Sequence, residues 1–87
     1  MKSYFDIDDE IIKTYQSNFQ TFRKVSKMTC QDVANKIGVT KQTVSNIERG
    51  KVKVNKSYCI LLMLVVDEVC ETNEQLDKIA VALKLRR

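Results

Sequence analysis

The chain carries only two glycines, Gly38 and Gly50, and no proline. A sheet of many strands needs tight turns, which rely on Gly and Pro, so the sequence has too few turn residues for such a fold. Both glycines follow short segments in which apolar residues recur at helical spacing, as glycines that end helices do. The sequence therefore predicts an all-α fold.

The size of the chain sets the number of domains. At 87 residues there is room for one domain, 1–87, with a thin core. The composition, 44% hydrophobic and 30% charged, is too apolar for a disordered chain and too charged for a membrane protein. The longest apolar run, residues 59–66, is far shorter than the roughly 20 residues that span a bilayer. We expect a soluble single domain with no membrane partner.

The absence of histidine excludes several kinds of site. Imidazole bases, Ser/His and Cys/His dyads and mixed Cys/His zinc sites all require it. The three cysteines, Cys30, Cys59 and Cys70, form no Cys-x-x-Cys pair, and free thiols suit a reducing cytosol. The N-terminal residues are acidic where a signal peptide is apolar. We expect a cytoplasmic protein that is not an enzyme, with no catalytic residue, no metal, no cofactor and no small-molecule substrate.

The basic residues are concentrated in the middle of the chain. Between residues 13 and 56, ten Lys and Arg residues are opposed only by Asp32 and Glu48. Residues 1–12 and 57–87 each carry a net negative charge. A block of one sign within a folded region attracts a polyanion, whereas solubility alone would intersperse the signs.

Five segments combine a helix-capping residue with an apolar stripe. At the last of them, Thr72 with Gln75 gives a capping-box pattern. The first twelve residues are expected to form a frayed arm. The expected helices run from near Asp8 to about Ser26, from Thr29 to Gly38, from Thr40 to Gly50, from Asn55 to about Glu71, and from Thr72 to about Leu85.

Residues 30–49 contain two of these helices, joined by the three residues Gly38-Val39-Thr40. Two short helices with a tight glycine turn describe a helix-turn-helix. The inward positions are apolar or small: Val33, Ala34, Ile37, Val39, Val44 and Ile47. The outward positions of the second helix are amides, hydroxyls and cations that fit base edges and phosphates: Lys41, Gln42, Ser45, Asn46 and Arg49.

From about Phe19 to Val66 the chain resembles the Cro-type (XRE) family of lambda-repressor-like domains. The resemblance is carried by Met28-Thr29, Val33-Ala34, Ile37-Gly38-Val39-Thr40, Val44-Ser45 and Ile47-Glu48-Arg49-Gly50-Lys51. It implies a five-helix lambda-repressor-like domain that binds double-stranded DNA. The helix-turn-helix would span about 30–49, and the helices of about 55–85 would complete the core and the dimer.

The resemblance also implies the roles of single residues. Lys41 and Gln42 would read bases, as the family does at the start of this helix. The expected DNA contacts are Thr40, Lys41, Gln42, Thr43, Ser45, Asn46, Arg49, Lys51 and Lys53. Arg23 and Glu48 would form a structural ion pair. The chain departs from the family at Cys30, where a phosphate-binding Gln is usual, and at Val54, where Pro is usual.

A dimer is expected because one recognition helix reads too few base pairs, and a two-fold pair places a second one about 34 Å away. The candidate interface is Leu61, Leu64, Val65, Ile79, Leu83 and Leu85, which exceed what the helix-turn-helix core can cover. A competing arrangement folds the fifth helix over the fourth within one chain.

We expect a transcription regulator, a repressor that acts as a homodimer on a palindromic operator. One alternative is an antitoxin or a restriction-modification controller protein of the same fold. Another is a protein-interaction module that has lost DNA binding, although an outward face of acids or apolar residues would suit that role better than the basic one present.

Overall fold

The computed structural model describes residues 7–86, and within that range every regular element is an α-helix. The helices are α1 (Asp9–Val25), α2 (Cys30–Ile37), α3 (Lys41–Glu48), α4 (Lys56–Glu71) and α5 (Glu74–Ala82). The all-α, five-helix class predicted from the sequence is confirmed. Residues 1–6 of the expected arm lie outside the described residues. The remainder of that arm is ordered: Ile7 is buried and α1 is already helical at Asp9, because the Asp8 carboxylate caps the helix there.

Each helix begins at a side chain that accepts a hydrogen bond from a free backbone N–H of the first turn. The capping residues are Asp8, Thr29, Thr40, Asn55 and Asn73. Four of these capping residues are the ones predicted from the sequence. The prediction that Thr72 caps α5 is wrong by one residue. Thr72 is still near helical dihedrals, and its hydroxyl donates back to the Val69 carbonyl, which leaves the extended Asn73 to cap α5.

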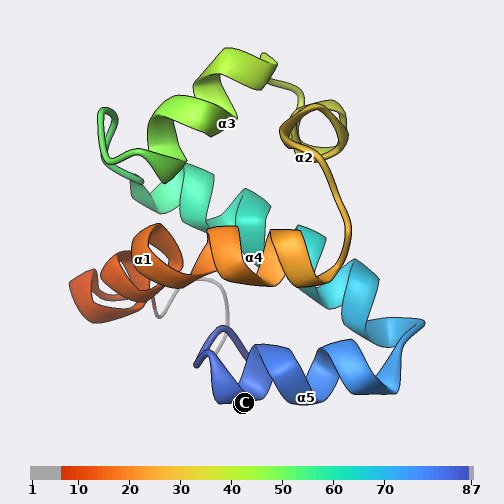
Figure 1. The fold of residues 1–87 in the computed structure, drawn as a ribbon. Helices are drawn as coiled ribbons and strands as arrows, with labels where there is room; N and C mark the ends of the chain where they lie inside the picture. Colours follow the sequence, from red (N-terminus) through yellow and green to blue (C-terminus); the bar gives the residue numbers. More distant parts are fainter. Residues whose placement is uncertain (1–6, 87) are drawn as a thin grey trace.

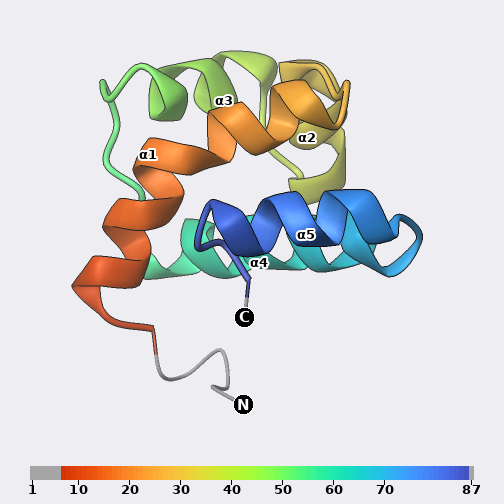
Figure 2. The same ribbon diagram turned by 60° about the horizontal axis from the view of Figure 1, so that its bottom comes forward.

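The helices pack around one core, with α1 and α4 at its centre. α1 contacts α3, α4 and α5, while α4 contacts α1, α2 and α5. α2 and α3 lie on one side of the molecule and α5 on the opposite side (Figures 1 and 2). The most completely buried large side chains are Phe22 of α1, Val33 of α2, and Cys59 and Val66 of α4. The core therefore holds the helix-turn-helix against a base of three other helices.

The C-terminal end of the described chain is fixed to α1 by two hydrogen bonds. The Tyr15 hydroxyl donates to the Leu85 carbonyl at 2.6 Å, and the Asn18 amide donates to the Leu83 carbonyl at 2.8 Å. These bonds satisfy the carbonyl groups of two residues that follow the last residue of α5. Arg86 then forms ion pairs with Asp67 of α4 and Asp77 of α5. The α4–α5 hairpin is thus closed within one chain.

Candidate nucleic-acid interface

The turn between α2 and α3 is fixed by backbone geometry. Gly38 has a φ of 77°, in the left-handed region that glycine adopts without strain. The N–H groups of Gly38 and Val39 both donate to the Ala34 carbonyl, at 2.9 and 3.1 Å. Thr40 then caps α3 by accepting the Thr43 N–H at 3.1 Å. The turn leaves α3 with a defined direction relative to α2.

An ion pair joins α1 to the last turn of α3. Arg23 Nε lies 2.6 Å from Glu48 Oε2 and Nη2 lies 2.9 Å from Oε1, so the contact is bidentate. The two side chains are only 11% and 6% exposed. Arg23 Nη1 also donates to the Met28 carbonyl at 2.8 Å, which ties in the α1–α2 connection. The hydrogen bond to Glu48 raises the pKa of Arg23, so this guanidinium stays charged.

Cys30, where the family usually has Gln, stands beside this ion pair. It is half-buried at the first position of α2, and its Sγ lies 3.8 Å from Glu48 Oε1. The neighbouring amide of Gln31 donates to Asn35 on its own helix at 2.8 Å. The first turn of α2 therefore presents a thiol to Glu48 and no amide in the position of the missing Gln.

The outer surface of α3 and the loop that follows it carry no free acid. Glu48 is the single acidic residue between positions 41 and 56, and Arg23 covers it. The side chains on this surface are exposed or half-buried: Thr40, Lys41, Gln42, Thr43, Ser45, Asn46, Arg49, Lys51 and Lys53. We call these nine residues the α3 face. They come from one helix, its cap and one loop, on the side of the molecule away from α5 (Figure 1).

Two hydrogen bonds organise the side chains of the α3 face. The Gln42 amide donates to Asn46 Oδ1 at 3.0 Å, one helical turn further along. The hydroxyls of Thr40 and Thr43 lie 2.9 Å apart. Gln42 keeps a free carbonyl oxygen and a second amide hydrogen, which are the two groups an amide uses on the edge of an adenine.

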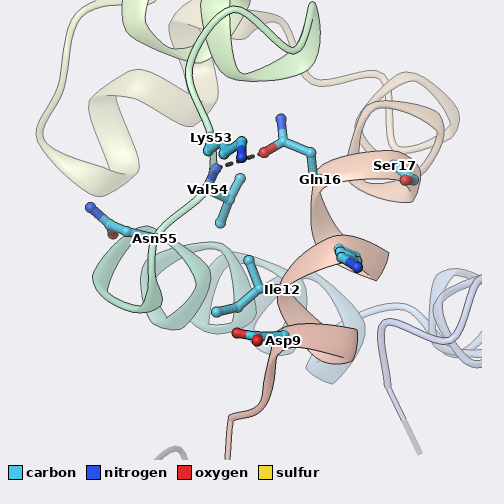
Figure 3. Close-up of a pocket in the computed structure, with 8 residues that line it drawn as sticks. Asp9, Ile12, Gln16, Ser17, Lys53, Val54 and Asn55 are labelled. Atoms are coloured by element: carbon cyan, nitrogen blue, oxygen red, sulfur yellow. Dashed lines mark hydrogen bonds between the residues drawn. The ribbon is translucent and has the colours of Figure 1, made fainter.

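Gln16 of α1 is a polar residue of this region that the sequence analysis missed. Its Oε1 accepts the Val54 N–H at 2.6 Å, and its Nε2 donates to the Ile47 carbonyl and, at 3.5 Å, to the Val52 carbonyl. Figure 3 shows Gln16 facing Val54 across a groove between α1 and the α3–α4 loop. A signal was present, because Gln16 interrupts the apolar stripe of α1 four residues after Ile12.

The six residues expected at a dimer interface are not all on the surface. Val65 and Leu85 are 2% and 5% exposed within a single chain, because α5 folds back against α4 and Leu85 joins the core. Their assignment to a free apolar face is corrected. Ile79 and Leu83 are half-buried against the core. Leu61 is also half-buried, and Leu64 is 46% exposed. Val81 of α5, which was not predicted, is 44% exposed.

Across residues 7–86, no three Cys, Asp or Glu side chains are grouped as metal ligands. No helix in the same range combines the length and the hydropathy that crossing a membrane requires.

A family model described as helix-turn-helix matches residues 20–66, which is more than half of the chain. The match begins within α1 and ends within α4, so it covers the ion pair, the turn and the whole α3 face. No curated protein and no solved structure matches the chain. With this match and this geometry, the chain belongs to the Cro-type (XRE) helix-turn-helix family of DNA-binding regulators.

Proposed function

We propose that the protein is a repressor that binds a palindromic DNA operator as a homodimer, with the α3 face against the duplex. The observation that carries this proposal is the composition of that face. Its groups are cations, amides and hydroxyls, and the one acid beside them in the sequence, Glu48, is paired with Arg23. Such a face attracts phosphates along its whole length and offers hydrogen bonds to base edges at its helical part.

Within the α3 face, two parts have different roles. Lys41 and Gln42, in the first turn of α3, reach into the major groove, where Gln pairs with adenine and Lys with guanine. Arg49, Lys51 and Lys53 follow the end of α3 and contact phosphates, which fix register without reading sequence. Bound at a promoter, a domain of this size represses by occupying the site.

The homodimer rests on a smaller surface than the sequence suggested. Leu64 of α4 and Val81 of α5 are exposed, and they lie at similar distances along the chain from the α4–α5 turn, hence at one level of the hairpin. Leu61 and Leu83 add partly exposed area. Burying an exposed apolar side chain contributes roughly 1.5–3 kcal/mol, so these residues can support a dimer at micromolar concentration after association costs.

Selection of bound sequences from a random duplex pool tests the DNA-binding part. We expect an enriched site with two-fold symmetry and half-sites about one DNA turn apart. Gln42→Ala should weaken binding to that site by about 1–3 kcal/mol and relax its specificity. Lys53→Ala should weaken binding to all duplexes by the same factor. An affinity that stays flat between low and physiological salt would exclude phosphate contacts by this face.

The dimer has its own test in Leu64→Lys. Because the side chain is exposed, the variant should fold normally, sediment as a monomer and lose much of its operator affinity. Gln75→Lys is the matched control, since it adds the same charge at an exposed position of α5. Sedimentation of the unmodified protein as a monomer at tens of micromolar would disprove the homodimer.

A further inference from the structure

We propose that Gln16 is a positioning residue for DNA binding, which holds the loop of Lys51 and Lys53 in the shape that contacts phosphates. The inference rests on the proposed function, because it assigns Gln16 an effect through those two lysines. Gln16 itself lies on α1, half-buried, and is not a member of the α3 face.

Gln16 forms a bridge to the α3–α4 loop. One side-chain amide contacts both ends of the segment that leads from α3 to α4. Its Nε2 donates to the carbonyl of Ile47, in the last turn of α3. Its Oε1 accepts the N–H of Val54 at 2.6 Å, just before α4 (Figure 3). The weaker contact to the Val52 carbonyl, at 3.5 Å, lies between these two. Gln16 therefore closes the loop onto α1.

The loop is anchored at both of its ends. Its beginning is fixed to α3, since the N–H groups of Lys51 and Val52 donate to the Asn46 carbonyl at 2.9 and 3.3 Å. Its end is fixed by the buried side chain of Val54 and by the bond from Val54 to Gln16. Lys53 lies directly between these two anchors. Removal of the Gln16 side chain takes away the partner of the Val54 N–H and so weakens the anchor at this end of the loop.

The amide group of Gln16 suits both partners of the bridge. The bridge needs an acceptor for an N–H and a donor for carbonyls on the same planar group, and an amide supplies both. Glu would keep the acceptor for Val54 but would face the Ile47 carbonyl with a second acceptor. Met has a similar length and makes neither bond. The two substitutions therefore separate the Val54 anchor from the Ile47 anchor.

The order of the loop backbone affects the affinity of its two lysines for DNA phosphates. A lysine that contacts a phosphate loses conformational freedom, and less is lost when its backbone is already ordered. Phosphate contacts are independent of sequence, and each contributes about −0.9 to the slope of log affinity against log salt. An effect that passes through Lys51 and Lys53 should thus appear equally on every duplex and in the salt slope.

The experiment compares Gln16→Met with Asn18→Leu. Asn18 is also a part-buried residue of α1 with one side-chain bond to a carbonyl, that of Leu83, on the α5 side. Dissociation constants are measured against salt for a random-sequence duplex and for the selected site. We expect Gln16→Met to lower the affinity for both duplexes by the same factor, about three- to tenfold, and to make the slope of log affinity against log salt shallower. Asn18→Leu should bind both duplexes like the unmodified protein. Because Gln16→Glu adds a negative charge near Lys53, it is compared by the hydrogen exchange of the Val54 N–H, which should be slower than in Gln16→Met.

Two further measurements separate positioning from general stability. Hydrogen exchange of the Val54 N–H in the free protein should accelerate in Gln16→Met and not in Asn18→Leu. With both Lys51 and Lys53 replaced by Ala, the additional effect of Gln16→Met on affinity should vanish. An undiminished effect in that background, or an unchanged Val54 exchange rate, would overturn the inference.

Other outcomes are equally decisive. Equal losses of DNA affinity in Gln16→Met and Asn18→Leu would mean that Gln16 contributes only to the stability of the fold. A loss confined to the selected site would mean that Gln16 acts through base reading by α3. Unmodified protein that binds neither duplex would overturn the proposed function and this inference together, whereas normal binding by Gln16→Met would overturn only the inference.

Discussion

α3 and α4 are held in place by different interactions. α3 has eight residues, of which only Val44 and Ile47 are buried, whereas α4 has sixteen and buries five. Besides its packing against α2, α3 has polar contacts from α1, namely the Arg23 ion pair and the Gln16 bridge. α4 is held by apolar packing against α1, α2 and α5.

The difference follows from what each helix presents to the outside. A helix that uses most of its surface for a ligand has little apolar area left to bury, and burial is worth only about 25 cal/mol per Å². Directional hydrogen bonds and a bidentate ion pair compensate, because they fix an angle as well as a distance. A helix without such a surface can be buried almost all round.

Glu48→Ala should have the largest effect. It leaves the Arg23 guanidinium in a nearly closed site, and because that group does not lose its proton the loss of stability should be about 3–5 kcal/mol. Arg23→Met should cost less, because the Met side chain keeps part of the packing. Urea unfolding of both variants measures the difference. Equal and negligible shifts would mean that the polar contact does not orient α3.

The apolar side of the comparison predicts a dependence on alkaline pH. Burial in α4 raises the pKa of the Cys59 thiol from its ordinary value of 9.0 to about 11. Between these values the unfolded chain loses a proton that the folded chain keeps, so stability is complete below pH 9 and falls as pH rises toward 11, by about 2 kcal/mol. Unfolding free energies from pH 8 to 11 should show this slope. Burial also raises the pKa of the Cys70 thiol, so Cys59→Ala should reduce the slope without abolishing it. An identical slope in that variant would assign the dependence to other groups.

The smallest expected effect is at the helix ends. Lys84 follows α5 with a φ of 61°, a left-handed conformation that glycine adopts more readily, and the Leu85 N–H then donates to the Ala80 carbonyl at 2.9 Å. Lys84→Gly should stabilise the protein by about 0.5–1 kcal/mol, seen as a higher melting temperature. Gly38→Ala is the converse test, since the added Cβ meets no atom within 4 Å and only the φ of 77° opposes it. A gain in stability there would contradict the argument.

The candidate site was predictable to the extent that it lies on α3 and its loop. Lys41, Gln42 and Lys53 are close in sequence, so one helix and one turn bring them to the same surface. The contacts from α1 differ. The pairing of Arg23 with Glu48 was predicted only from the resemblance to the family. The role of Gln16 was not predicted, because its partners Ile47 and Val54 lie more than thirty residues away.

The sequence by itself determined the helices and most of their boundaries, because caps such as Thr29 and Thr40 act on residues three positions away and apolar stripes repeat within one element. The tertiary structure decided which apolar residues remain exposed. Val65 and Leu85 are as hydrophobic as Leu64, yet the fold of α5 against α4 buries the first two and leaves the third in solvent. Exposure depends on the relative placement of several helices, and that placement is set by the sum of contacts between residues far apart in the chain.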